Sequence, residues 1–152
     1  MSARMTNPVM IVPDALQAMI SLSKVVSQVG VPPETTELVH LRVSQINGCA
    51  PCINMHAGAL GKSKESDERM LMVAAWREAL CFTDAERAAL GLAEAVTRLG
   101  DRPDPVPDDV WAEAARHYGE QELGALVIGI GLVNLWNRVN VSTRQAPTAD
   151  WS

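Results

Sequence analysis

The sequence lacks the features of a nucleic-acid-binding or membrane-spanning protein. It holds 13 Lys and Arg against 18 Asp and Glu, and the net charge of −5 argues against the basic face that nucleic-acid binding requires. No run of five or more Lys and Arg occurs, so an anionic membrane surface is not an expected partner. The most apolar stretch, Leu123 to Val133, is interrupted by glycines and falls far short of the roughly 20 apolar residues that span a bilayer.

Cysteine is also scarce, and no signal for export accompanies it. The first residues contain one Arg and no sustained apolar run, which does not fit a signal peptide, and Met5 could begin translation as well as Met1. We therefore expect a cytoplasmic protein. Cysteines are kept reduced in that compartment, so a Cys-x-x-Cys pair among only three cysteines is expected to be catalytic or metal-binding rather than a structural disulfide.

The sequence has no persistent period-two alternation and no internal repeat, and instead shows helix signals along its length. The clearest is Thr83 followed by Glu86, a capping box that opens a helix. The last helix is apolar on nearly every face, so we expect its own chain or another subunit to bury it. Helices are predicted at residues 14–29, 33–47, 49–61, 63–77, 83–99, 108–117 and 120–141. The predicted fold is an all-α bundle of six to seven helices with no sheet, in a single domain of residues 1–152.

The residues best suited to chemistry lie beside a glycine that should end one helix and precede another. Cys49, Cys52 and His56 are spaced i, i+3 and i+7, which places them on one face of the helix predicted to begin at residue 49. Both thiols then lie in its first turn, where unpaired backbone N–H groups and the positive end of the helix dipole favour a thiolate. Two cysteines at this spacing can also close a disulfide.

Glu37 completes the predicted site from the preceding helix. If Gly48 turns the chain into a hairpin, Glu37 lies eleven residues before the turn and His56 eight after it. The offset is about 4.5 Å along the helices. The two side chains could then face each other, with Glu37 orienting His56 and His56 taking a proton from a cysteine. The residues alone favour Cys49 as the attacking thiol, because the more N-terminal cysteine is usually the more exposed.

These residues, in this spacing, resemble the alkylhydroperoxidase D and carboxymuconolactone decarboxylase superfamily. The resemblance lies in Glu37, eleven further residues, Cys-x-x-Cys, three residues and His56, and in the sequence from Leu41 to Cys49. Other similar segments are residues 76–79, 82–87 and 135–138. The resemblance implies an alkylhydroperoxidase D-like bundle with a helical core at 13–146 and tails at 1–12 and 147–152.

By this resemblance the chain reduces organic hydroperoxides. The second cysteine of the family's motif is the attacking one, which maps to Cys52, and Cys49 then resolves the sulfenic acid to a disulfide. The family's Glu and His map to Glu37 and His56 as the proton relay. The best-known peroxidases of the family carry a His immediately before the second cysteine, where this chain has Pro51. One proton acceptor of the family's site is therefore absent.

The resemblance also sets expectations for cofactors and partners. No metal, flavin or haem is expected, and the electrons should come from an external thiol reductant, either a protein or a small thiol. The family's assemblies imply a homo-oligomer, from a dimer to a trimer or hexamer.

Other interpretations remain open. A carboxymuconolactone decarboxylase-like enzyme would not depend on the cysteine pair, and a non-catalytic oligomeric redox-sensing module would use the pair only for slow oxidation. Cys49, Cys52, His56 and Glu37 are all acceptable zinc ligands, although structural zinc usually draws a second Cys or His pair. His40 is one helical turn after Glu37 and is either a structural histidine or a substitute for the relay group missing at residue 51.

Overall fold

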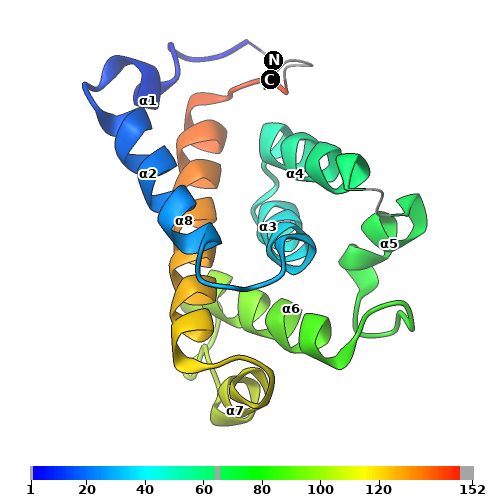
Figure 1. Cartoon of the computed structure of the whole chain (residues 1–152). Helices are drawn as coiled ribbons and strands as arrows, with labels where there is room; N and C mark the ends of the chain where they lie inside the picture. The colour runs from blue at the N-terminus through cyan, green and yellow to red at the C-terminus, as the bar shows by residue number, and fades with distance from the viewer. Residues whose placement is uncertain (1, 64–65, 148–152) are drawn as a thin grey trace.

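The computed structural model describes residues 2–63 and 66–147, and in these ranges the chain forms helices and no strand (Figure 1). The α-helices are α1 (Pro8–Ile11), α2 (Ala15–Ser27), α3 (Pro33–Asn47), α4 (Ala50–Lys62), α5 (Asp67–Met72), α6 (Asp84–Thr97), α7 (Asp108–His117) and α8 (Glu120–Thr143). Single turns of 3-10 helix are η1 (Val73–Ala75) and η2 (Leu99–Asp101). The expected all-α bundle is confirmed, but the described residues form eight α-helices rather than six or seven.

The additional helix, α1, lies in the N-terminal segment for which the sequence predicts a tail. Asn7 caps it by accepting a hydrogen bond from the backbone N–H of Val9 at 3.2 Å, and Pro8 occupies the start, where a missing N–H costs little. The buried side chain of Val9 packs against α2 and α8. The tail prediction for residues 1–12 is therefore wrong at α1, because one helical turn is too short to show an apolar period. Of the expected C-terminal tail, residues 148–152 lie outside the described residues.

The helix expected at 63–77 is divided. Ser63 ends α4 instead of opening a helix, and its Oγ donates to the backbone oxygen of Leu60 at 2.9 Å. Ser66 caps α5 by accepting from the backbone N–H of Arg69 at 3.2 Å, and η1 follows directly after α5. Serine serves at either end of a helix, so the sequence alone did not distinguish the two positions.

The longest helix, α8, runs through the bundle and contacts α2, α3, α4, α6 and α7 (Figure 1). By length and composition it could cross a membrane, with a mean hydropathy of 1.2 over its most apolar window, but half of that window is buried inside the bundle. This is the pattern of the core helix of a globular domain. Burial within the chain is incomplete, since Ile128, Leu135 and Val141 of α8 remain exposed.

Buried asparagines fasten α8 to the end of α3. Asn47, the last residue of α3, donates from Nδ2 to the Oδ1 atoms of Asn134 and Asn137, at 2.9 Å in both cases. Asn137 in turn donates to the hydroxyl of Ser44 at 3.1 Å. Such a network is stable in a core because its polar groups are paired with one another. It holds the turn after α3, where the cysteines begin, against α8.

Candidate active site

The turn between α3 and α4 places both cysteines at the start of α4. Gly48 adopts a left-handed φ of 65°, which favours glycine, and the backbone N–H of Cys49 then donates to the backbone oxygen of Ser44 at 3.0 Å. Cys49 is the N-cap residue of α4, and Cys52 lies in its first turn. Pro51 lies between them, where it removes no helical hydrogen bond. Both sulfurs are thus held at the positive end of the α4 dipole.

The two cysteines form a disulfide and differ in their access to the outside. Their Cα atoms are 5.3 Å apart, within the usual range for a disulfide. Cys49 is 0% exposed, whereas Cys52 is 3% exposed and lines a hollow. The expectation from chain order that Cys49 would be the more exposed is wrong, because the N-cap position is completely enclosed.

Glu37 and His56 meet across the turn, as their spacing predicts. The Nδ1 atom of His56 lies 2.8 Å from Oε2 of Glu37. His56 is buried, and the Glu37 side chain is 31% exposed. Burial pushes the pKa of Glu37 upward, but the hydrogen bond to His56 and the electrostatic interactions with His56 and His40 outweigh it, so the net pKa is lowered. Glu37 is therefore an anion that contacts the Nδ1 edge of the His56 ring.

His40 packs edge-on against His56. Their ring centroids are 5.1 Å apart, with an angle of 61° between the ring planes. Burial, together with the charge on His56, lowers the pKa of His40 to about 4, although the negative charge of Glu37 opposes the shift. At neutral pH the His40 ring is thus uncharged, and it forms part of the wall around the Glu37–His56 pair.

Within residues 2–63 and 66–147, one group of possible metal ligands results, and it differs from the zinc set considered from the sequence. Ligand atoms of Glu37, His40 and His56 lie within 4.8 Å of one another. The sulfurs of Cys49 and Cys52 are bonded to each other instead. Two imidazoles and a carboxylate are suitable ligands for a divalent metal. Glu37 and His56 already satisfy each other directly, however, and that contact is the one expected of a proton relay.

Two adjoining hollows open onto these groups. The larger, of about 550 Å³, lies among α2, α4 and α8 and is lined by Cys52 and by apolar side chains that include Leu16, Met19 and Trp136. The smaller, of about 230 Å³, is lined by Glu37, His40 and His56. Ser23, Ser27, Met55 and Trp136 line both hollows. The sulfur and the carboxylate–imidazole pair are therefore reached from neighbouring, largely apolar spaces.

Asn140 is a member of the site that the sequence analysis did not identify. Its Nδ2 donates to Sγ of Cys52 at 3.3 Å, and its side chain is buried. A signal was present in the sequence, because Asn134, Asn137 and Asn140 recur every third residue along an otherwise apolar helix. Polar residues at that spacing share one face and must find partners when buried.

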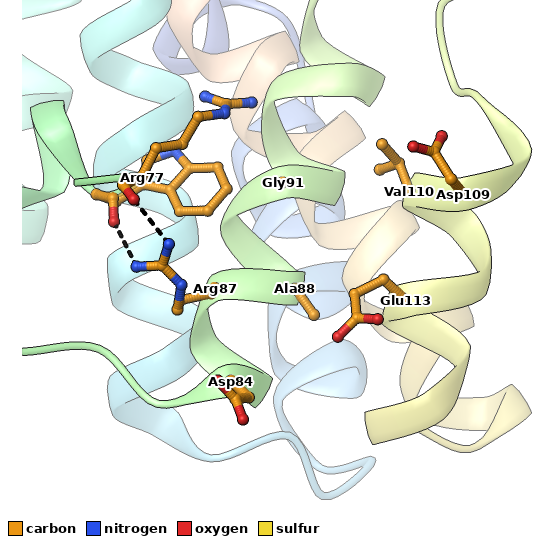
Figure 2. A pocket seen from close by; sticks show the side chains of 9 residues that line it. Arg77, Asp84, Arg87, Ala88, Gly91, Asp109, Val110 and Glu113 are labelled. Carbon is orange, nitrogen blue, oxygen red and sulfur yellow. Dashed lines mark hydrogen bonds between the residues drawn. The ribbon is translucent and has the colours of Figure 1, made fainter. Parts of the chain in front are cut away.

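A separate hollow between α6 and α7, of about 350 Å³, is lined mainly by charged side chains (Figure 2). Arg87 donates to the backbone oxygens of Trp76 and Arg77, each at 2.8 Å, and dashed lines in Figure 2 mark its hydrogen bonds. Arg87 thus fastens the segment after η1 to α6. The lining contains neither cysteine nor histidine.

Comparisons of sequence identify a matching family and two relatives of this chain. The model of the carboxymuconolactone decarboxylase family matches residues 13–95. The uncharacterised protein YdfG of Bacillus subtilis (strain 168) is 35% identical over 132 residues, which cover 87% of this chain and 88% of YdfG. The uncharacterised protein YnjA of Escherichia coli (strain K12) is 34% identical over 108 residues, which cover 71% of this chain and 58% of YnjA.

Solved structures have the same fold. One, from Agrobacterium tumefaciens, matches with a TM-score of 0.90 and 31% identity over 98% of this chain and 100% of its own; it is a protein of unknown function, provisionally named the antioxidant defence protein AhpD. The debrominase Bmp8 without ligand matches with a TM-score of 0.79 and 22% identity over 90% of this chain and 73% of its own. At that identity the likeness to Bmp8 concerns the fold alone.

Proposed function

The chain belongs to the carboxymuconolactone decarboxylase family, and we propose that it is a thiol-dependent peroxidase that reduces organic hydroperoxides through Cys52 and Cys49. The observation that carries the proposal is the joint placement of a Cys-x-x-Cys pair at the start of α4 and a Glu37–His56 pair at 2.8 Å, both opening onto apolar hollows. Neither packing nor a structural metal requires this combination.

In the proposed reaction the Cys52 thiolate attacks the outer oxygen of the hydroperoxide. A sulfur–oxygen bond forms as the oxygen–oxygen bond breaks, and the alkoxide that leaves takes one proton from His56 to become the alcohol. Cys52 is then a sulfenic acid. The sulfur of Cys49 attacks it, the hydroxyl leaves as water, and the disulfide forms. Two electrons from an external thiol reductant restore both thiols.

Glu37 and His56 move the protons. With Glu37 ionised and in contact with Nδ1 of His56, the imidazole carries its proton on Nδ1 and keeps Nε2 as the acceptor. His56 then takes the Cys52 proton, through water, and later returns it to the leaving alkoxide. Glu37 acts by holding the ring in one tautomer and orientation.

The proposal includes an organic rather than an inorganic peroxide, a homo-oligomer and a cytoplasmic setting. A space of about 550 Å³ with apolar walls beside Cys52 accommodates an alkyl or aryl group. The exposed apolar residues Ile128, Leu135 and Val141 on α8 are a surface that a second copy of the chain would cover. A reducing cytoplasm would supply the thiol reductant.

The direct test is to titrate thiols in denatured protein before and after a stoichiometric amount of cumene hydroperoxide. We expect the three thiols of the reduced chain to fall to one within seconds, leaving Cys81. Cys52→Ser should abolish the rapid loss, whereas the control Cys81→Ser should retain it. If all three thiols persist after long exposure, the proposal is wrong, and a reaction that survives removal of both Cys49 and Cys52 would favour the decarboxylase interpretation.

A further inference from the structure

A chain of three hydrogen bonds runs from the N-terminal helix to the sulfur of Cys52. The backbone N–H of Val9 donates to Oδ1 of Asn7 at 3.2 Å, Nδ2 of Asn7 donates to Oδ1 of Asn140 at 3.0 Å, and Nδ2 of Asn140 donates to Sγ of Cys52 at 3.3 Å. Asn140 is 3% exposed and its bond to the sulfur is buried, so water does not compete appreciably for that bond, whereas the two bonds of Asn7 are partly buried. Asn7 and Asn140 are 133 positions apart in the sequence, and Asn140 and Cys52 are 88 positions apart.

The direction of every bond is set at the N-cap of α1. A backbone N–H can only donate, so the atom of Asn7 that faces Val9 must be its oxygen. The amide nitrogen of Asn7 therefore faces Asn140 and requires an oxygen there. This leaves the amide nitrogen of Asn140 directed at the sulfur. Exchanging the oxygen and nitrogen positions of either side-chain amide would bring two donors or two acceptors face to face, which is unfavourable where water is excluded.

We propose that Asn140 stabilises the thiolate form of Cys52 and thereby makes Cys52, rather than Cys49, the attacking sulfur, and that Asn7 is a positioning residue that holds Asn140 in the required orientation. This inference rests on the proposed peroxidase function only for its role in turnover. A neutral amide cannot accept the thiol proton, but its N–H stabilises negative charge on sulfur. This effect adds to the stabilisation of the thiolate by the first turn of α4.

The position next to Cys52 supports this assignment. Pro51 has neither a donor nor an acceptor in its side chain, and the hollow beside Cys52 is lined mainly by apolar groups, with Lys24 of α2 as the charged side chain in its lining. Within that lining Asn140 is the side chain with a hydrogen bond to the sulfur. In apolar surroundings a bare thiolate is costly, so a fixed N–H donor there has a larger effect than it would in water.

The test measures the Cys52 thiolate without relying on peroxide turnover. In a Cys49→Ser, Cys81→Ser background, the rate of alkylation by iodoacetamide is followed from pH 4 to pH 10. Asn140→Asp keeps the shape and the oxygen that accepts from Asn7, but directs a carboxylate at the sulfur. We expect the thiol pKa to rise, with alkylation at pH 6 slower by about tenfold for each unit of that rise.

Two further variants keep the test decisive. Asn7→Ala leaves Asn140 in place but removes the amide that orients it. We expect a smaller rise of the thiol pKa in this variant, which can be measured even if Asn140→Asp folds poorly. The control Gln121→Glu makes the same amide-to-carboxylate change at an exposed position of the same helix, and it should leave the pH profile unchanged. Unchanged profiles in Asn140→Asp and Asn7→Ala, both folded, would overturn the inference. A shifted profile in a protein that never reduces peroxide would uphold it while refuting the peroxidase.

Discussion

Two carboxylates, Glu37 on α3 and Glu94 on α6, are paired in different ways. Glu94 on α6 has a side chain that is 3% exposed, and it accepts from Nη2 of Arg42 at 2.6 Å, from Nε1 of Trp76 at 3.0 Å and from Arg77. Glu37 is ten times more exposed, and its partner is the single imidazole of His56. In both, the effect of burial on the pKa is outweighed by these partners, and the pKa is lowered.

The partners decide what each carboxylate can do. The guanidinium groups around Glu94 keep their protons at any ordinary pH, so this cluster fixes a geometry and nothing passes through it. An imidazole gains and loses its proton near neutral pH, so the Glu37–His56 pair can pass a proton to and from the hollows beside it. The cluster around Glu94 is therefore suited to a structural role, whereas the contact between Glu37 and a single histidine is the arrangement that the proposed proton transfer requires.

The largest effect should come from Glu94→Gln. The change removes the anion that Arg42 and Arg77 share inside the bundle, and breaking a buried ion pair in this way lowers the free energy of unfolding by about 3 kcal/mol. Urea denaturation monitored by circular dichroism measures it. Glu113→Gln, at the exposed pair with Arg116, is the matched control and should cost under about 0.5 kcal/mol. Equal losses in the two variants would contradict a structural role for Glu94.

Glu37→Gln should show the reverse pattern. The amide can still contact His56 but no longer carries the charge that fixes its tautomer, so we expect kcat/KM for organic hydroperoxide to fall about 100-fold. The denaturation midpoint should change little, because Glu37 is partly exposed. Glu34→Gln, at an exposed position of the same helix, is the control and should keep full activity. An unstable but fully active Glu37→Gln would make Glu37 a structural residue like Glu94.

The sequence predicted the part of the site that depends on local spacing. Glu37 and His56 are 19 residues apart, on two helices joined by Gly48, so counting residues from the turn was enough to place them together. Thr83 and Glu86 form the expected capping box for the same reason, since both lie within one turn.

Contacts between distant segments could not be predicted in this way. Asn140 lies 88 residues from Cys52, and Glu94 lies 52 residues from Arg42, so only the packing of α8 and α6 on α3 brings them together. The relative burial of Cys49 and Cys52 likewise depends on which helices cover the turn. Helix signals along the chain determine which residues share a face, but they do not determine which face meets which.

The smallest expected effect concerns His40, whose ring packs edge-on against His56 and forms part of the wall around the Glu37–His56 pair. Its pKa in the folded protein is about 4, below the ordinary 6.5, so the unfolded chain binds a proton first as the pH falls. The contribution of uncharged His40 to the free energy of unfolding is therefore fully present above pH 6.5 and is lost as the pH falls from 6.5 toward 4. We expect a loss of about 2 kcal/mol, below the full value for such a shift because the ring is only partly buried.

The difference between the wild type and His40→Gln isolates this contribution from the other groups that titrate in acid. Urea denaturation of both proteins at pH 7.5 and at pH 4.5 measures it, and the wild type should lose more stability over that interval than the variant. His117→Gln, at a surface position paired with Glu113, is the control and should follow the wild type. Equal losses of stability in the wild type and in His40→Gln would mean that His40 takes up its proton as readily in the folded protein as in the unfolded chain. The His56 ring would then face a second cation in acid, and the Glu37–His56 pair would resemble the permanently charged cluster around Glu94.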